Sequence, residues 1–158
     1  MILSENINSN YPIIAVKSTV PPGTTENLVR SIILQYIGKD ANIGFVMNPE
    51  FLREGSAVSD FMQPDRIVIG SSSDEVGDKF EEIYKKLNTK IVRVSITAAE
   101  MIKYTSNAFL ATKISFANEI GNICKQLNIN VYDVMQGVGL DHRINPYFLN
   151  AGLGFGGS

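Results

Sequence analysis

The stretch "PIIAVKSTVPPGTTENLVRSIILQYIG", residues 12–38, decides the fold that the sequence predicts. It begins with "PIIAVKS" (12–18), a short apolar run rich in isoleucine and valine that is typical of a buried strand. Two prolines and a glycine at 21–23 predict a turn, after which Thr24 or Thr25 can cap a helix. Apolar residues then recur at helical spacing to the end of the stretch. The stretch therefore predicts a strand, a tight turn and a helix.

The same pattern continues beyond this stretch. Further strands are predicted at 42–50, 65–73 and 90–95, and a helix that opens with acidic residues and closes with lysines is predicted at 74–87. The succession strand, helix, strand, strand, helix, strand is typical of a parallel α/β sheet with crossover helices. Four strands are too few for a complete doubly wound dinucleotide-binding domain. We therefore expect the second half of a Rossmann-like parallel sheet domain, without its first half.

The remainder of the chain predicts helices. Residues 97–128 contain one interior glycine and no proline, which predicts a single helix of roughly 45 Å. Residues 129–139 predict a second, shorter helix, and a loop with proline and glycine follows. We expect residues 1–95 to be the C-terminal half of an NAD-binding domain and residues 96–158 to begin an all-α dimerisation domain.

The composition limits the class of protein. The chain has 158 residues, 44% hydrophobic and 19% charged, with a formal charge of −2, so it can bury a core and lacks the basic surface that nucleic acid or a membrane would attract. Its one cysteine, Cys124, excludes an internal disulfide and suits a reducing compartment. The sequence shows no signal peptide and no transmembrane run. We expect a cytoplasmic protein with neither a nucleic-acid nor a membrane partner.

Two carboxylates follow the second predicted strand. In "NPEFLREG" (48–55), Glu50 and Glu54 are four residues apart, and a helical turn would bring both to one side. Ligands of open α/β sheets bind at the C-terminal ends of strands, and two carboxylates in one cleft can take different tasks. The alternative is a solvated acidic turn that pairs with Arg53.

Two further pairs are candidates. Ser18 and Thr19 close the first strand, and their hydroxyls could touch a cofactor or orient a water; the alternative is a role in capping and turn chemistry. Lys103 and Asn107 would share one helix face, where they could stabilise an oxyanion or bind sugar hydroxyls. The alternative for Lys103 is an ordinary exposed lysine.

The loop that ends the chain carries weaker signals. The glycines of "GLGFGG" (152–157) match G-x-G-x-x-G, but no strand precedes them and no helix follows them, as a pyrophosphate loop requires. His142 has no partners at ligand spacing, so we expect no metal site. Arg143 is a plausible phosphate contact. Cys124 is expected in the core, not as a nucleophile.

The order of these motifs carries a more specific signal than any one of them. "VKSTVPPGTT", "NPEFLREGSAVSDFMQPDRIVIG", "AAEMIKYTSNAFLATKISFANEI", "DHRI" and "GFGGS" together resemble the UDP-glucose 6-dehydrogenase family, which includes GDP-mannose and UDP-N-acetylmannosaminuronate enzymes. The resemblance covers residues 11–158. It implies an NAD-binding domain, a central helical dimerisation domain and a UDP-binding domain. The GDP-mannose branch shares a similar glycine loop, so it stays an alternative.

The resemblance also implies roles. The family oxidises the C6 alcohol of the sugar to a carboxylate with two NAD+, through a thioester-type intermediate on a cysteine. Thr19 and Glu50 would position or activate the hydrolytic water, Glu50 as general acid/base, while Lys103 would stabilise the C6 oxyanion and Asn107 would help to hold the substrate. The residues implied to line the NAD site are Ser18, Thr19, Val20 and Glu54. Those implied to line the UDP-glucose site are Glu50, Phe51, Leu52, Arg53, Lys103, Asn107, Phe148, Asn150, Phe155 and Gly156, with Arg143 reaching the partner subunit's site in a homodimer built on 97–128.

Two parts of the family pattern have no counterpart here. The phosphate-binding glycine loop would precede Met1, and the catalytic cysteine would follow Ser158 directly. We therefore expect a partial UDP-glucose 6-dehydrogenase that is inactive as this chain alone. The alternatives are part of a GDP-mannose 6-dehydrogenase and a non-catalytic dimerisation module.

Overall fold

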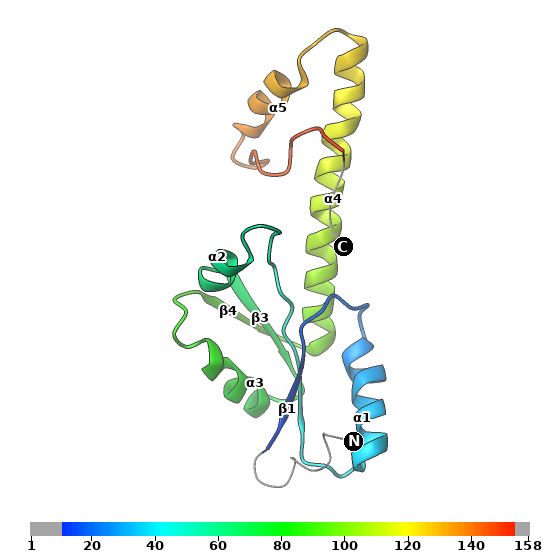
Figure 1. Cartoon of the computed structure of the whole chain (residues 1–158), viewed down its shortest axis with the longest axis vertical. Helices are drawn as coiled ribbons and strands as arrows, with labels where there is room; N and C mark the ends of the chain where they lie inside the picture. The colour runs from blue at the N-terminus through cyan, green and yellow to red at the C-terminus, as the bar shows by residue number, and fades with distance from the viewer. Residues whose placement is uncertain (1–10, 154–158) are drawn as a thin grey trace. The chain divides into compact units, whose positions relative to one another are not determined.

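The computed structural model describes residues 11–153 (Figure 1). The chain divides into two compact units, a sheet unit up to Tyr104 and a helical unit from Thr105, and helix α4 (Ile96–Gln126) contributes to both. Phe155 and Gly156 lie outside the described residues, as does most of the glycine pattern at 152–157. No helix among the described residues is long and apolar enough to cross a membrane.

The sheet unit contains the four predicted strands in an α/β arrangement. They are β1 (Ile13–Val16), β2 (Gly44–Met47), β3 (Arg66–Ser71) and β4 (Lys90–Val94). The strands lie side by side in chain order, with β1 parallel to β2 and β3 parallel to β4. The middle pair, β2 and β3, is antiparallel.

This antiparallel pair departs from the parallel sheet that the sequence predicted. The connection from β2 to β3 holds only the six-residue helix α2 (Ala57–Met62). This connection does not carry the chain back along the sheet, and β3 starts at the end where β2 finishes.

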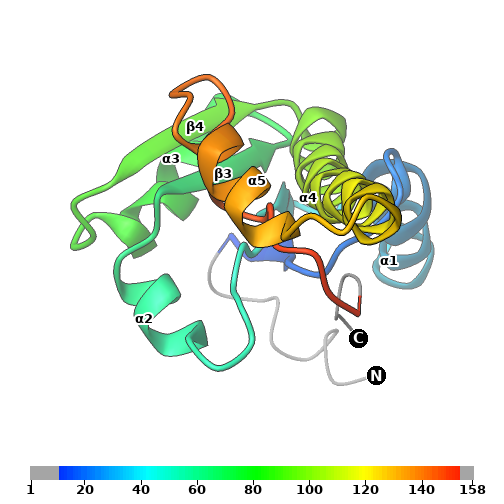
Figure 2. The same ribbon diagram turned by 90° about the horizontal axis from the view of Figure 1, so that it is seen from above.

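The reversal also distributes the helices over both faces. The π-helical segment η1 (Thr24–Val29) and α1 (Arg30–Ile37) connect β1 to β2, whereas α3 (Asp74–Glu81) and the 3-10 turn η2 (Glu82–Tyr84) connect β3 to β4. Right-handed crossovers between strands of opposite direction place their helices on opposite faces. Figures 1 and 2 show α1 and α3 on the two sides of the sheet.

Each face buries its own cluster of side chains. The cluster under α3 and η2 consists of Val46, Ile67, Ile69, Val76, Phe80 and Tyr84. The cluster under α1 and the first turns of α4 consists of Phe45, Met47, Val68, Ile96 and Ala99. Alternate residues of β2 and β3 thus point to opposite faces, which explains their continuous apolar sequence.

Helix α4 lies directly on the sheet because of one glycine. A Cβ atom on Gly70 of β3 would lie 2.7 Å from both the Ala99 Cβ and the Ser95 carbonyl oxygen. Only a glycine permits this approach. The first two turns of α4 thereby run back from the end of β4 towards the end where β1 and β2 finish.

The helical unit contains the rest of α4 and α5 (Val131–Gly139), which confirms the helices predicted at 97–128 and 129–139. Asn130 begins α5, and its side-chain oxygen accepts a hydrogen bond from the Tyr132 N–H at 3.1 Å. The buried cluster is small: Ala117, Met135 and Leu149. Cys124 is buried within α4, as predicted.

Candidate functional site

The candidate site lies where β1 and β2 end, at the same edge of the sheet. Ser18 and Thr19 follow β1 directly, and both are exposed. Asn48 and Glu50 follow β2. Because β1 and β2 are parallel, their C-terminal ends bring these polar side chains to one edge, as the sequence predicted.

Lys103 is buried and pairs with Glu50. The lysine is 5% exposed, and its Nζ lies 3.4 Å from Oε1 of Glu50. The other oxygen of Glu50 accepts a hydrogen bond from the Leu52 N–H at 2.8 Å. The alternative of an ordinary exposed lysine is therefore wrong. The separation of 3.4 Å exceeds that of a normal N–H···O hydrogen bond, so the two groups form a loose ion pair. The Lys103 ammonium could therefore also donate a hydrogen bond to a reacting oxygen of a substrate.

An aromatic ring completes this edge of the sheet. The ring centre of Phe51 lies 5.2 Å from the Lys103 Nζ and 4.1 Å from the Arg66 Cζ. Arg66 begins β3, which starts at this edge because of the antiparallel reversal. Both contacts are within cation–π distance. The antiparallel pair thus adds a second cation to the site, which the sequence did not predict.

The predicted helical turn between Glu50 and Glu54 is not formed. Residues 48–53 have no regular secondary structure, and Glu54 is exposed in the turn that leads to α2. The Arg53 guanidinium binds Asp60 at 2.6 and 3.0 Å, and the Arg53 backbone N–H donates to Asp60 at 2.9 Å. The hydrogen bonds from the Arg53 side chain, and to a smaller extent the bond from its backbone N–H, hold the pKa of Asp60 well below its usual range.

A buried asparagine, missed at the level of sequence, holds the strand ends together. Asn48 is 2% exposed, and its Oδ1 accepts from the Lys17 Nζ at 2.6 Å and from the Tyr84 hydroxyl. Its Nδ2 donates to the Val68 carbonyl at 2.8 Å. One side chain thus joins the ends of β1 and β2, the strand β3 and the turn η2. The signal for this role was an amide directly after a buried strand.

A buried glutamate, also missed, caps the first helix. Neither predicted cap is formed: the Thr24 hydroxyl donates to the Pro21 carbonyl, and the buried Thr25 hydroxyl has no partner among the described residues. Instead Glu100 of α4, fully buried, accepts from the Gly23 N–H at 2.5 Å and the Thr25 N–H at 2.7 Å. A carboxylate is the favoured group at a helix N-terminus, but its position 75 residues away hid it from local patterns.

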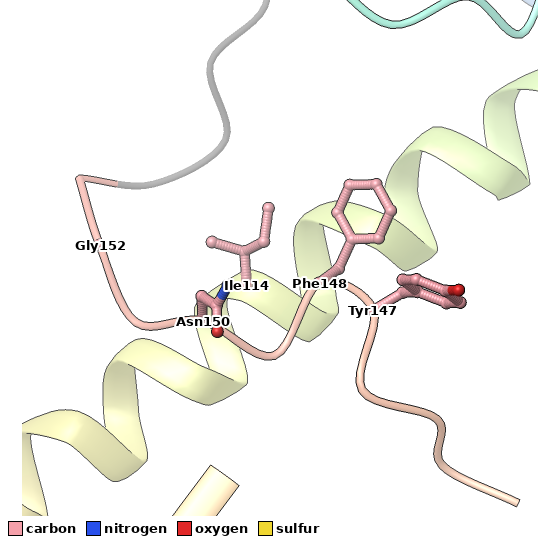
Figure 3. A pocket seen from close by; sticks show the side chains of 5 residues that line it. All are labelled: Ile114, Tyr147, Phe148, Asn150 and Gly152. Carbon is pink, nitrogen blue, oxygen red and sulfur yellow. The ribbon is translucent and has the colours of Figure 1, made fainter. Parts of the chain in front are cut away.

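The helical unit holds a second group of predicted residues. A shallow pocket of about 270 Å³ is lined by Ile114, Tyr147, Phe148, Asn150 and Gly152 (Figure 3). Phe148 has a φ of 63°, which is rare for a bulky side chain and often marks functional segments. The Gly152 N–H donates to the Asn118 side chain at 2.8 Å, which holds the loop against α4.

The remaining predicted residues are placed as follows. Val20 packs against the core cluster under α1. Asn107 lies one turn beyond Lys103 on α4 and is half-buried. Arg143 is exposed and binds Asp141 at 2.6 Å, which lowers the pKa of that carboxyl. Among residues 11–153, no group of three or more histidine, cysteine, aspartate or glutamate side chains could hold a metal ion.

Comparison with known proteins agrees with this geometry. Residues 2–88 match the model of the NAD binding domain of the UDP-glucose/GDP-mannose dehydrogenase family, and residues 97–158 match the model of its central domain. The chain belongs to the UDP-glucose/GDP-mannose dehydrogenase family. The resemblance and the Rossmann-like fold class expected from the sequence are thereby confirmed, with the strand reversal as the one correction.

Individual members of the family are similar over nearly the whole chain. UDP-glucose 6-dehydrogenase TuaD of Bacillus subtilis is 48% identical over 99% of this chain. The structure of a UDP-glucose dehydrogenase from Pyrobaculum islandicum superposes with a TM-score of 0.91 at 46% identity over 96% of the chain and 35% of its own. A GDP-mannose dehydrogenase from Pseudomonas aeruginosa gives 0.81 at 41% over 96% of the chain and 36% of its own. The chain spans 33% of the length of TuaD, about a third.

The residues present fit part of the NAD site of the family. Exposed hydroxyls at a strand end, such as those of Ser18 and Thr19, are suited to bind a cofactor's polar groups. The N-terminus of the first helix is not suited to a pyrophosphate, because Glu100 already accepts from its backbone N–H groups. Among the described residues, the hydroxyls at the strand end could therefore contact NAD, but the first helix does not offer a pyrophosphate site.

Proposed function

We propose that this chain is part of an NAD-dependent UDP-glucose 6-dehydrogenase, which oxidises UDP-glucose to UDP-glucuronate. Family membership, 46% to 48% identity to UDP-glucose enzymes and 41% to a GDP-mannose enzyme support this assignment. The observation that carries it is the buried Lys103 opposite Glu50 at the strand ends. Part of a GDP-mannose 6-dehydrogenase and a non-catalytic dimerisation module are the alternatives that experiment must exclude.

In this proposal Lys103 stabilises negative charge on the oxygen at sugar C6. Its ammonium group has three donors, and burial strengthens its interaction with a developing oxyanion. Asn107, one turn further along α4, would hold the substrate. Glu50 is partly exposed, so its carboxylate can take a proton from a water that Thr19 orients. Lys103 would thus stabilise the negative charge that develops on the substrate, and Glu50 would accept the proton that the water releases.

The proposed cofactor contacts are made by Ser18, Thr19, Val20 and Glu54. When bound, NAD+ would accept the hydride that leaves C6. The exposed hydroxyls of Ser18 and Thr19 would bind and orient the cofactor. Val20, which packs on the core, would fix the path of the loop. A cytoplasmic location stays a prediction from the sequence, as do the domain limits of 1–95 and 96–158.

The proposed substrate contacts fall into two groups along the chain. The residues assigned to UDP-glucose by resemblance are Glu50 to Arg53, Lys103, Asn107, Phe148, Asn150, Phe155 and Gly156, with Arg143 directed to a partner subunit. Phe148 and Asn150 line the shallow pocket of the helical unit.

We propose that the chain forms a homodimer through α4. Phe109, Phe116 and Ile123 are 63%, 54% and 46% exposed, and they follow one another at intervals of seven residues. Such spacing forms an apolar stripe along a helix, which is typical of helix pairing. We call these three residues the α4 stripe. It lies entirely within the helical unit.

Binding measured on the isotopically labelled chain by NMR tests the proposal. We expect UDP-glucose to shift the resonances of Glu50 to Arg53 and Lys103, and NAD+ to shift those of Ser18 and Thr19. Lys103→Met should weaken UDP-glucose binding about tenfold or more, because a charge-assisted contact is lost. Lys125→Met, an exposed position on the same helix, is the control and should change nothing.

Two binding outcomes would count against the proposal. Stronger shifts with GDP-mannose than with UDP-glucose would favour the GDP-mannose enzyme. No shifts with either nucleotide sugar or with NAD+ would favour the non-catalytic module. The sole cysteine, Cys124, is buried in α4, so it cannot carry the thioester of the second oxidation, and we expect no UDP-glucuronate from the chain with UDP-glucose and NAD+. Formation of UDP-glucuronate by the purified chain would contradict that expectation.

A further inference from the structure

Glu100 has no part in the proposed chemistry, yet it is as buried as any polar residue described. Its side chain is 0% exposed, and its two oxygens receive the N–H groups of Gly23 and Thr25 at 2.5 and 2.7 Å. Placing a carboxylate in the interior is costly unless hydrogen bonds and local charge stabilise it. The N-terminal end of the helix that begins at Thr24 supplies both the N–H donors and a partial positive charge. A simple threonine cap would have served the helix alone, so the distant glutamate requires another explanation.

The two segments that Glu100 joins both carry residues of the candidate site. The loop from Lys17 to Thr25 carries Ser18 and Thr19, the proposed cofactor contacts. Glu100 also lies three residues before Lys103 on α4, so the two side chains share one side of the helix. One turn earlier, the Thr97 hydroxyl donates to Glu26 at 3.1 Å, which adds a second bond between the same two segments.

Local geometry shows that the loop accommodates this bond. Gly23 has a φ of 90°, a left-handed conformation that presents its N–H to the carboxylate. The Thr25 hydroxyl is buried without a partner in the described part of the chain, while the Thr25 backbone N–H donates to Glu100. An unpaired buried hydroxyl costs free energy that the carboxylate bonds must offset.

We infer that Glu100 is a positioning residue: its carboxylate locks the cofactor loop to the turn of α4 that presents Lys103, so both sides of the site move as one body. This inference rests on the proposed function of the site and deepens it. Glu100 is fully buried, so its carboxylate is not presented to a cofactor or substrate. It acts through Lys103 on one side and through Ser18 and Thr19 on the other.

NMR of the ligand-free chain tests the inference, with Glu100→Gln as the variant. Glutamine retains the shape but has only one oxygen, so one backbone N–H loses its acceptor. We expect the amides of Gly23 and Thr25 to exchange about tenfold faster or more. If Glu100 positions the site, the Lys103 side-chain resonances and the amides of Ser18 and Thr19 also shift. Glu119→Gln, an exposed position on α4, should leave all of these unchanged.

The outcomes separate positioning from capping and from the proposed function. If Gly23 and Thr25 change while Lys103 keeps its wild-type resonances, Glu100 is only a helix cap and the inference is overturned. If Glu100→Gln does not fold, Glu100→Asp keeps the charge on a shorter side chain and should give the same set of shifts, smaller in size. These measurements contain no ligand, so failure of the wild-type chain to bind NAD+ or UDP-glucose would overturn the proposed function separately.

Discussion

The two units of the molecule hold their polar side chains in different ways. In the sheet unit, the bonds of Glu100 and Asn48 connect segments 20 to 77 residues apart in the sequence. In the helical unit, the bonds between distant segments are exposed: the Gly152 N–H donates to Asn118, 34 residues away, and the Lys113 Nζ donates to the Ile144 carbonyl, 31 residues away. A buried bond is costly to break because its partners cannot turn to water, whereas the partners of an exposed bond can. The sheet unit is therefore preorganised for chemistry, as a site that handles charge requires.

The apolar side chains show the same contrast. The sheet unit buries a cluster on each face of its sheet. The helical unit buries only three residues fully in its cluster and leaves the α4 stripe exposed. An exposed apolar stripe indicates an interaction surface. In the proposed homodimer, a partner would cover the apolar surface that the helical unit leaves exposed.

The largest expected effect compares two asparagines, one in each unit. Asn48→Ala removes the partner of the Val68 carbonyl and the Tyr84 hydroxyl, both buried, so we expect a loss of about 2 to 4 kcal/mol in the free energy of unfolding. Asn118→Ala removes one exposed bond to Gly152 and should cost about 1 kcal/mol or less. Urea unfolding followed by circular dichroism measures both. Equal losses would remove the contrast between the units.

The next effect concerns the α4 stripe. Phe116→Glu places a charge in the middle of the proposed dimer interface, so we expect the dissociation constant to rise about tenfold or more. Sedimentation velocity over a range of concentrations measures the change. Tyr36→Glu, which alters an aromatic side chain 83% exposed in the sheet unit, is the control. A wild-type chain that remains monomeric would refute the dimer.

A pH experiment compares two acid–arginine pairs. The pKa of Asp60 is lowered by hydrogen bonds from the Arg53 side chain and backbone, and the pKa of Asp141 is lowered in the same way by Arg143. A lowered folded-state pKa gives stability that is complete above the unfolded value, about 3.9, and is lost as the pH falls towards the folded value.

Removal of either acid should therefore flatten the acid side of the stability profile. We expect Asp60→Asn to reduce the fall in unfolding free energy between about pH 5 and 2.5, and Asp141→Asn to reduce it less. Asp60 also accepts from the Ser56 hydroxyl, whereas Asp141 has Arg143 alone as the cause of its shift. Thermal unfolding at a series of pH values provides the test. A larger effect of Asp141→Asn than of Asp60→Asn would show that the pair in the helical unit contributes more to stability than the pair in the sheet unit.

The smallest effect is expected at an exposed pair within the sheet unit. Glu75 and Lys79 lie 2.7 Å apart on α3, with side chains 73% and 47% exposed. Glu75→Gln should change the free energy of unfolding by less than about 0.5 kcal/mol. This variant shows whether the strength of the sheet unit resides in its buried long-range bonds. A loss as large as that of Asn48→Ala would show that surface charges matter equally.

The sequence alone determined the elements and the family. Apolar periodicity and turn residues depend on neighbours in the chain, so the four strands, α4, α5 and the burial of Cys124 could be predicted. The order of the motifs identified the family, which the comparisons confirm. It also drew attention to Lys103 and Glu50, although not to their contact.

Only the tertiary structure decided how these parts meet. The connection that holds α2 reverses the direction of β3, and this reversal brings Arg66 to Phe51 and puts α1 and α3 on opposite faces. The seat of α4 on Gly70 places Lys103 beside Glu50 and allows Glu100 to cap a helix 75 residues away. Such contacts depend on which elements pack together, and no local pattern of residues contains that information.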